Sequence, residues 1–396
     1  MFLSDAQKCR PPKKPVFMRV FGSFPLLDNI RYYFDFIKPC TNRMITRKNR
    51  KKRPCFLYTG CGMLVIVQKT RISNTKFTGV SGGLFNLMIT KYSTKKPKNQ
   101  EVITRVVKYL SLSGQERFRD CANWIEFYAN KEADRLKVSR ANFCGHRFCP
   151  MCAWRQAKKD ALKIGVLMKY IEQEHDKAFI FVTLTAPNVK AEDLKTEITR
   201  YNKAFMKLAQ RKAFKKINLG YIRKLEVTYN EERNDYHPHF HVVFAVNPSY
   251  FKSRDYIKQE IWLNEWRDVM GDVSITQVDV RKVRKNENGK EVNELAKYTA
   301  KDSDYGKSQE IFDAFYLALK GRQVLTYNGL FADANKLFKA DKLNNYIGID
   351  ETEYVYMLLY RWGLKEYVET ERRELTSEER QKVNRALLDE VEVEDE

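Results

Sequence analysis

The order of strand-forming and helix-forming segments predicts an α+β protein with a four-stranded antiparallel sheet and helices on one face of that sheet. The segments follow one another as strand 179–185, helix 191–216, strands 221–229 and 240–246, helix 256–269 and strand 273–283. This β-α-β-β-α-β order is typical of the split β-α-β, or ferredoxin-like, arrangement. We therefore expect one compact sheet domain in the middle of the chain.

Each of these elements has a local signal. The run 179–185 is rich in strand formers and is stopped by Pro187. The helix at 191–216 has apolar residues at helical spacing, namely Leu194, Ile198, Tyr201, Phe205 and Leu208. A polar loop at 230–235 joins the two middle strands, and Gly271 ends the second helix.

Further helical patterns flank this unit. One long pattern, 154–174, precedes it, and three more follow it at 291–302, 309–319 and 331–343. The chain ends in an acidic run, Asp389 to Glu396, which we expect to be a solvated tail.

The net charge of +22 favours a polyanionic partner, and nucleic acid is the commonest one, although an ordinary soluble basic protein would have the same composition. The first 87 residues carry seventeen Lys or Arg and three acids, so +14 of this charge lies there. Two interpretations stay open for this segment. It is either a basic arm that holds DNA without sequence specificity or a poorly structured extension, including translated sequence upstream of a start at Met88.

The apolar stretches, such as Phe56 to Val67, fall short of the roughly 20 residues that span a bilayer. The first residues lack the basic-then-apolar layout of a signal peptide. We therefore expect a cytoplasmic protein, in which the eight cysteines serve as thiols or metal ligands rather than as disulfides.

Three of the five histidines lie at alternate positions of one segment, His237-Pro-His239-Phe-His241. Successive side chains of a strand point to opposite faces, so His239 and His241 emerge side by side and suit a divalent metal ion. Pro238 is expected to start the strand, which leaves His237 at its edge as a weaker ligand candidate. Glu226, on the neighbouring strand, would add a carboxylate if the register brings it near. The alternative is a pair of half-buried histidines satisfied by hydrogen bonds.

The segment 293–301 places Glu294, Tyr298 and Lys301 at i, i+4 and i+7, on one stripe of a helix. A tyrosine with a pKa near ~10 is a poor nucleophile, so it needs an electrophile polarised by a metal, such as a phosphate. Lys301 would stabilise charge on the phosphate or the phenolate, and Glu294 would act as a base for a second nucleophile such as water. Taken alone, the stripe also fits an ordinary helix with a salt-bridged face and a buried tyrosine.

A cysteine cluster precedes the first strand. Cys144, Cys149 and Cys152 are separated by four and two residues, and Cys121 lies upstream as a fourth thiol. Such spacing is typical of structural zinc, with His146 as a possible replacement for Cys121, while scattered free thiols are the alternative. Basic residues near this cluster and near Tyr298 are candidates for contacts with nucleic acid or for solvated helix faces, and they are Arg147, Arg155, Lys158, Lys159 and Lys297.

Three motifs in this order resemble the plasmid rolling-circle replication initiators of the HUH endonuclease superfamily, specifically the Rep family of small Gram-positive plasmids. The matching segments are Phe181 to Asn188, Tyr236 to Val243 and Glu294 to Tyr305. The resemblance covers roughly residues 105–305, and the first 87 residues lie outside it.

The resemblance implies a role for individual residues. It implies that His239 and His241 bind Mg²⁺ or Mn²⁺, that Tyr298 cuts one strand at the double-strand origin and stays joined to the 5′ phosphate, and that Glu294 acts in termination. The family has a similar cysteine cluster, which supports Zn²⁺ as a structural ion. The implied partners are duplex and single-stranded origin DNA, a host helicase and host replication proteins. The oligomeric state stays open, with a dimer as one option.

These observations divide the chain into five predicted parts. They are a basic extension (1–87), a zinc-binding module with a linking helix (88–175), the HUH nickase domain (176–305), a C-terminal helical region (306–380) and an acidic tail (381–396). The favoured function is nicking and rejoining of origin DNA. The competing hypotheses are a related relaxase or single-strand transposase, a non-enzymatic zinc-dependent DNA-binding regulator, and a metal hydrolase that uses water throughout.

Overall fold

The computed structural model describes residues 55–58, 64–67, 83–284, 289–348 and 350–383. It divides the chain into two compact units, Met1–Gly79 and Val80–Glu396. In the first unit, β1 (Cys55–Tyr58) and β2 (Leu64–Val67) form an antiparallel pair. Most of the predicted basic extension and the acidic tail beyond residue 383 lie outside the described residues.

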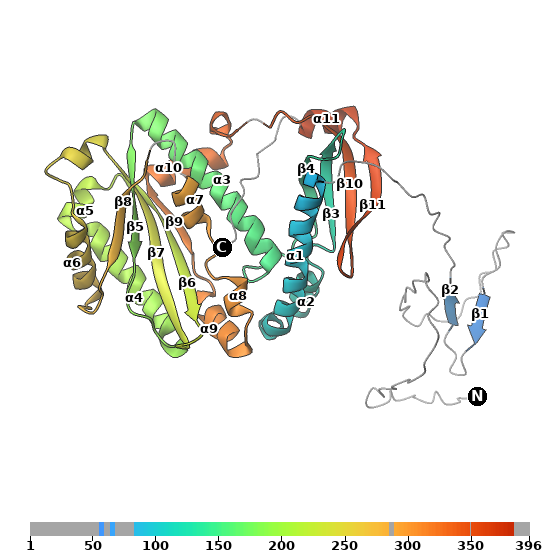
Figure 1. Ribbon diagram of the computed structural model, residues 1–396, viewed down its shortest axis with the longest axis horizontal. Coiled ribbons are helices and arrows are strands. Elements are labelled where there is room, and N and C mark those ends of the chain that lie inside the picture. Colours follow the sequence, from blue (N-terminus) through green and yellow to red (C-terminus); the bar gives the residue numbers. More distant parts are fainter. Residues whose placement is uncertain (1–54, 59–63, 68–82, 285–288, 349, 384–396) are drawn as a thin grey trace, which may run out of the picture. The chain divides into compact units, whose positions relative to one another are not determined.

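The second unit contains two antiparallel sheets, which confirms the predicted α+β class (Figure 1). The larger sheet has the order β8-β5-β7-β6-β9. Its strands are β5 (Ala178–Leu184), β6 (Gly220–Asn230), β7 (Asp235–Val246), β8 (Val278–Lys282) and β9 (Leu325–Gly329). The sheet therefore has five strands rather than four, because β9 from the region after the predicted domain pairs with the edge of β6.

Helices cover both faces of this sheet, so the expectation of helices on one face is wrong. One face packs against α4 (Ala191–Gln210) and α6 (Gln259–Met270), next to the short helix α5 (Lys212–Ile217). The other face packs against α3 (Pro150–His175), α7 (Gly289–Ala296) and α10 (Leu330–Lys339) (Figure 1). The reason is visible in β7, where Phe240, Val242 and Phe244 point to the first face while Val243 and Ala245 point to the second.

The predicted helix 191–216 is present as α4 followed by α5, and its apolar stripe is buried. Leu194, Ile198, Tyr201, Phe205 and Leu208 are all at most 1% exposed. The predicted strand 273–283 is shorter than expected, since β8 begins at Val278. The helix before it ends at Gly271, which adopts the left-handed conformation that glycine favours.

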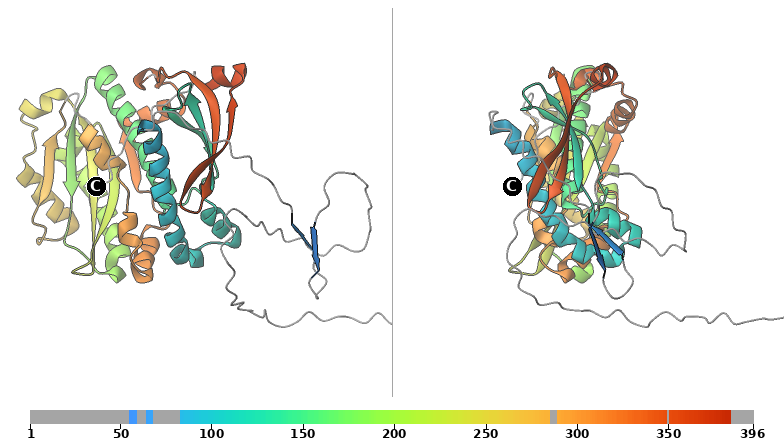
Figure 2. Two further views of the ribbon diagram at one scale, coloured as in Figure 1. Left: turned by 45° about the vertical axis from the view of Figure 1, so that its right-hand side comes forward. Right: turned by 90° about the vertical axis from the view of Figure 1, so that its right-hand side faces the viewer.

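The smaller sheet joins two distant parts of the chain in the order β11-β10-β3-β4. Its strands are β3 (Trp124–Asn130), β4 (Leu136–Ala141), β10 (Tyr354–Gly363) and β11 (Glu366–Glu374). Figure 2 shows the red C-terminal strands beside the teal ones. The prediction that 306–380 is helical is therefore wrong for the part that contains β9, β10 and β11. Within that region, α9 (Gln309–Leu319) agrees with its predicted bounds, and α11 (Ser377–Val383) follows the last strand.

The remaining helices complete the second unit. They are α1 (Gly83–Val106), the short turn η1 (Val107–Tyr109), α2 (Leu112–Arg119), η2 (Pro248–Lys252), α8 (Asp302–Tyr305) and η3 (Asn344–Tyr346). Among the described residues, no helix is long and apolar enough to cross a membrane.

Asp313 on α9 holds the end of α1 and η1 in place. Its carboxylate accepts hydrogen bonds from Lys108 Nζ at 2.5 Å, the Tyr109 hydroxyl at 2.7 Å and Gln309 Nε2 at 2.8 Å. Partial burial opposes ionisation, but these three donors outweigh it and lower the pKa of Asp313. The contact therefore stabilises the fold while the carboxylate is ionised.

We expect Asp313→Asn to lower the free energy of unfolding by about 1 kcal/mol at pH 7. Because the pKa of Asp313 is lowered in the folded state, its stabilisation is present above the unfolded value of roughly 3.9 and is lost as the pH falls through the folded value. The difference between the two proteins in urea denaturation should shrink below about pH 4. A constant difference down to pH 3 would contradict this account.

Candidate metal centre and nucleophile

Three side chains from two neighbouring strands face one another on the side of the sheet that carries α3 and α7. The strands pair so that Glu226 of β6 lies opposite His239 of β7 and Lys224 lies opposite His241. Glu226 Oε2 is 3.3 Å from His239 Nε2 and 3.0 Å from His241 Nε2. The three residues are buried. Two imidazole nitrogens and a carboxylate oxygen, all within 4.8 Å of one another, form a group that could hold a divalent metal ion.

Hydrogen bonds orient both imidazole rings. His239 Nδ1 lies 3.2 Å from the carbonyl oxygen of His237, and because a carbonyl only accepts, Nδ1 is the donor. His241 Nδ1 lies 3.3 Å from Thr183 Oγ1 on β5. Both Nε2 atoms therefore face Glu226. Contacts of this kind at the far nitrogen are what fixes metal-binding histidines.

The Glu226 carboxyl stays ionised in this position. Its burial opposes ionisation, but hydrogen bonds and charge from His239 and His241 outweigh the burial and lower the pKa of Glu226. An ionised carboxylate beside two imidazoles fits the requirements of a metal ligand.

His237 lies within β7, which begins at Asp235, so the expectation that Pro238 starts the strand is wrong. The His237 ring stacks on His239 with the ring centroids 5.1 Å apart. Burial, together with the nearby His239 and Arg233, lowers the pKa of His237 to about 4. Its side chain lines a separate polar hollow of about 420 Å³ and is not part of the group with Glu226.

The predicted helix 291–302 is interrupted, so the single stripe of Glu294, Tyr298 and Lys301 is wrong. Helix α7 ends at Ala296, Tyr298 lies in the bend that follows, and Lys301 precedes α8 as its N-terminal cap. The three side chains are thus held by three different local structures.

Hydrogen bonding to β6 explains the interruption. The carbonyl oxygen of Thr299 accepts a hydrogen bond from the backbone N–H of Val227 at 2.7 Å. That N–H is available because β9 pairs with β6 only as far as Lys224. The bond ties the segment that carries Tyr298 to Val227, the residue that follows Glu226 in β6.

Glu294 approaches the same group from α7. Its Oε2 lies 3.8 Å from His241 Nε2, and its Oε1 accepts a hydrogen bond from Lys297 Nζ at 3.0 Å. The structure therefore brings together Glu226, His239, His241 and Glu294, with Lys297 as the ion-pair partner of Glu294.

The two tyrosines of the last motif differ in accessibility. Tyr305 is 2% exposed, and its hydroxyl donates to the carbonyl oxygen of Phe148 at 3.3 Å. Tyr298 is half-buried, packs against the main core and has Lys95 Nζ 5.7 Å from its ring centroid. It also lines a cavity beside the sheet. Tyr298 is therefore the more accessible of the two tyrosines.

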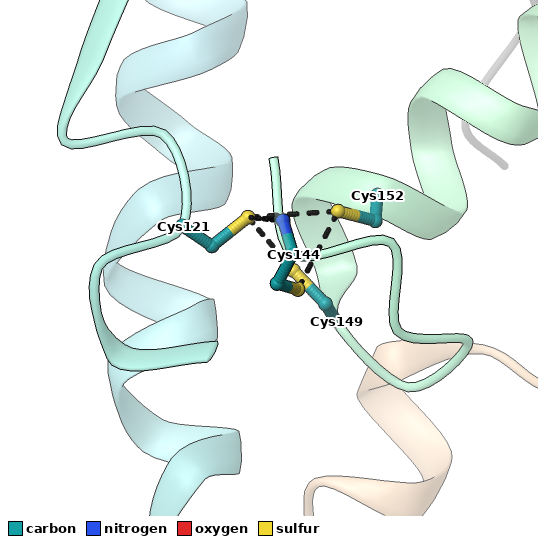
Figure 3. Close-up of side chains that lie close together, drawn as sticks. All are labelled: Cys121, Cys144, Cys149 and Cys152. Carbon is teal, nitrogen blue, oxygen red and sulfur yellow. Dashed lines mark hydrogen bonds between the residues drawn. The ribbon is translucent and has the colours of Figure 1, made fainter. Parts of the chain in front are cut away.

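The four cysteines converge on one point from separate elements (Figure 3). Cys121 follows α2, Cys144 follows β4, Cys149 caps α3 and Cys152 lies in its first turn. The Sγ atoms of Cys121 and Cys152, and those of Cys121 and Cys149, are 3.5 Å apart, and those of Cys144 and Cys152 are 3.6 Å apart. Tetrahedral zinc with Zn–S bonds of about 2.3 Å needs S···S distances of about 3.8 Å. The thiols therefore fit a zinc ion.

His146 is not a member of this group. Its Nδ1 accepts a hydrogen bond from the backbone N–H of Phe148, and its ring packs against Phe118 and Tyr316. The fourth member of the group with Cys144, Cys149 and Cys152 is therefore Cys121 and not His146.

The basic residues predicted to contact nucleic acid occupy different environments. Arg147 donates to two carbonyl oxygens at the end of α9, at 2.6 and 2.7 Å, and Arg155 donates to the Tyr92 hydroxyl at 2.7 Å. Lys158 is buried beside the Trp154 ring, and Lys297 pairs with Glu294. Lys159 is exposed. Sequence patterns cannot separate these cases, because each residue type fits both a phosphate contact and an internal one.

Three neighbours of these groups carried no signal in the sequence. Thr183 contacts His241, Lys224 lies opposite His241, and the buried Lys96 donates to the carbonyl oxygen of Cys121 at 2.6 Å. If the register of β6 and β7 were known, Lys224 could have been predicted as a neighbour of His241, because it lies two residues before Glu226 on the same sheet face. Lys96 comes from α1, and no local pattern links it to the cysteines.

The comparisons with known proteins identify a family and several relatives of this chain. A family model described as "Replication protein" matches residues 135–368. The chain therefore belongs to this replication protein family, the plasmid rolling-circle replication initiators that its motifs resemble. No solved structure matches significantly.

Individual relatives carry the same description. "Protein rep" of Staphylococcus aureus is 50% identical over 216 residues, which is 54% of this chain and 94% of that protein. "Protein rep" of Bacillus amyloliquefaciens is 36% identical over 244 residues, covering 56% of this chain and 72% of the relative. A third "Protein rep", from Streptococcus pneumoniae, is 31% identical over 236 residues, covering 58% and 73%.

Proposed function

We propose that this protein initiates plasmid rolling-circle replication by nicking one strand of the origin with Tyr298, and that it rejoins the ends when the round is complete. The observation that carries the proposal is the group of Glu226, His239 and His241, with the backbone of the Tyr298 segment bonded to the residue that follows Glu226. The paired histidines on β7, the central strand of the larger sheet, support the HUH endonuclease fold that the motifs suggest.

The nicking step is a transfer of a phosphoryl group from one oxygen to another. The Tyr298 oxygen forms a bond to the scissile phosphorus while its proton leaves to solvent, and the bond to the 3′ oxygen breaks. The released 3′ oxygen takes up a proton, and the protein stays joined to the 5′ phosphate. A Mg²⁺ or Mn²⁺ ion held by Glu226, His239 and His241 would polarise the phosphate.

Glu294 and Lys301 have separate roles in this proposal. Glu294 lies close to His241 and would accept a proton from a second nucleophile, such as water, at termination. Its Oε1 accepts a hydrogen bond from Lys297 Nζ at 3.0 Å, which holds the carboxylate in position. Lys301, at the start of α8, would stabilise charge on the phosphate.

The four thiols would hold a structural Zn²⁺ that joins the region before the large sheet to α3. The overall basic charge suits origin DNA in duplex and single-stranded form, and a host helicase would unwind the nicked duplex. Arg147 and Lys159 are the exposed members of the candidate DNA contacts near this zinc site.

A nicking assay tests the proposal. The protein is incubated with an end-labelled single-stranded origin oligonucleotide and Mn²⁺, and the products are separated under denaturing conditions. We expect cleavage together with a covalent protein–DNA adduct. Cleavage without an adduct would indicate a metal hydrolase that uses water, and binding without cleavage would indicate a regulator. A relaxase or transposase would form the adduct but would fail to support rolling-circle replication of an origin plasmid.

The contact between Thr183 and His241 gives a second test. Thr183→Val removes the hydroxyl that orients the imidazole and keeps the side-chain volume, so Mn²⁺ should bind about tenfold more weakly. Thr185→Val is the matched control, because the Thr185 hydroxyl contacts the backbone of Gln277 instead. Isothermal titration calorimetry with Mn²⁺ measures both affinities. Equal affinities in the two variants would contradict the assignment of His241 as a ligand.

A further inference from the structure

A cavity of about 600 Å³ lies beside the candidate nucleophile. Its volume is within the range of small-molecule sites. Its walls come from α3, β6, β9, α10, the loop of the cysteine cluster and the bend that carries Tyr298. The residues that matter for its chemistry are Lys163, Lys224, Tyr298, Tyr327, Asn335 and Lys339.

Two buried polar atoms in this cavity have no hydrogen-bond partner among the described residues. They are the hydroxyl oxygen of Tyr327 and Oδ1 of Asn335. Leaving a buried polar atom unsatisfied destabilises a fold, so such atoms are rare without a reason. A ligand that hydrogen bonds to both would supply the missing partners.

The cavity is also positively charged. Lys224 is 5% exposed, Lys163 Nζ lies 4.7 Å from the centroid of the Tyr327 ring, and Lys339 adds a third ammonium group. Asp160 is the acidic residue in the wall. Arg147 and Lys297 also line the cavity, so five cationic residues accompany one carboxylate and favour an anionic ligand. A buried lysine is costly without one.

The cavity neighbours the candidate metal group through Lys224, which lines the cavity. Lys224 of β6 lies opposite His241 of β7 in the strand register. Its side chain lies on the same sheet face as that of Glu226, two residues further along the strand. Tyr298 lines the cavity as well. An occupant would therefore lie beside the phosphate that Tyr298 attacks.

We propose that this cavity binds one nucleotide of the origin strand next to the scissile phosphate. The nucleotide's phosphate is neutralised by Lys163 and Lys224, and its base hydrogen bonds to the Tyr327 hydroxyl and Asn335 Oδ1. This rests on the proposed nicking function. The same chemistry would suit a free nucleotide, so the experiment separates the two sources.

Photo-crosslinking tests the position of the nucleotide. 5-Iododeoxyuridine is placed at each position across the nick in turn, in oligonucleotides bound to the full chain carrying Tyr298→Phe. We expect crosslinking to Tyr327 from one position beside the nick, identified by mass spectrometry of the peptide. Crosslinks that never include Tyr327 would overturn the proposal. So would a crosslink to Tyr327 from free 5-iododeoxyuridine monophosphate that an excess of the oligonucleotide does not displace.

Two variants test the chemistry of the cavity. Tyr327→Phe removes an unsatisfied hydroxyl, so the melting temperature should stay the same or rise, whereas binding of the origin strand should weaken about fivefold. Lys163→Met should weaken binding more than Lys336→Met, which removes the same charge from an exposed position on α10 where Lys336 pairs with Asp333. Fluorescence anisotropy at fixed salt measures these affinities.

Equal binding by Tyr327→Phe and the parent chain, or equal losses for the two lysine variants, would overturn the proposal. The binding affinities of these variants can be measured without cleavage of the DNA. An adduct in the wild-type protein with unchanged binding by the cavity variants would leave the proposed function standing without this inference. Cleavage that persists in the Tyr298→Phe background would contradict the nucleophile and leave the binding data valid.

Discussion

Replacing Tyr298 by phenylalanine is expected to abolish the covalent protein–DNA adduct and to slow strand cleavage by at least about a thousandfold. The substitution removes only the oxygen that would attack the phosphate. The ring keeps its packing against the core and its contact with Lys95, so folding should be unaffected. Binding of Mn²⁺ should also persist, because Glu226, His239 and His241 are unchanged. A denaturing gel of the Mn²⁺ reaction shows the adduct directly.

Tyr305→Phe is the matched control for this experiment. It removes one hydroxyl from the other tyrosine of the same motif, which is buried and donates to the carbonyl oxygen of Phe148. We expect it to lower the free energy of unfolding by about 1 kcal/mol and to retain the adduct. An adduct that survives in Tyr298→Phe and disappears in Tyr305→Phe would move the nucleophile to Tyr305 and show that the buried side chain becomes accessible when DNA binds.

The histidine strand could be predicted because its signal is local. Alternation fixes which side chains share a face, so His239 and His241 follow from the sequence of β7 alone. The approach of Glu226 depends on the register of two strands, which a polar loop leaves open. The structure supplies that register by pairing Glu226 with His239.

The bend at Tyr298 could not be predicted, because it depends on a contact that is distant in sequence. Spacing favours a continuous helix, but the Thr299 carbonyl bonds to Val227 on β6 instead. The smaller sheet could not be predicted for a related reason. β10 pairs with β3 across more than two hundred residues, and the strand signal of β10 and β11 has no partner nearby in the chain. The large sheet also has a second apolar face, which includes Val243 and Ala245, and the signal of these small residues is weaker than that of Phe240 and its neighbours.

Cys149→Ser is expected to eliminate bound zinc and to lower the melting temperature by about 10 °C, which corresponds to roughly 4 kcal/mol for a unit of this size. Cys149 is 0% exposed and caps α3, the long helix on the site-bearing face of the large sheet. The same four-thiol cluster ties Cys121 after α2 to Cys144 after β4. Without the ion, the thiols would have one another and the backbone N–H groups of Cys144, Gly145 and His146 as partners. Zinc content by mass spectrometry and thermal unfolding measure the two effects.

Lys96 provides a second test of zinc binding by the four cysteines. A zinc ion with four thiolates carries a net charge of about −2, which is costly to bury. Lys96 is 0% exposed, and its ammonium group donates to the carbonyl oxygens of Cys121 at 2.6 Å and Arg119 at 3.3 Å, so it places a positive charge beside the cluster. Lys96→Met keeps the apolar stem and removes the charge. It should retain zinc but lose it faster to a chelator, with Mn²⁺ affinity unchanged because Glu226 lies in the other site. Full zinc retention by Cys149→Ser would show that the cluster does not hold the ion. Equal chelator resistance in Lys96→Met and wild type would show that the Lys96 charge does not stabilise the bound ion.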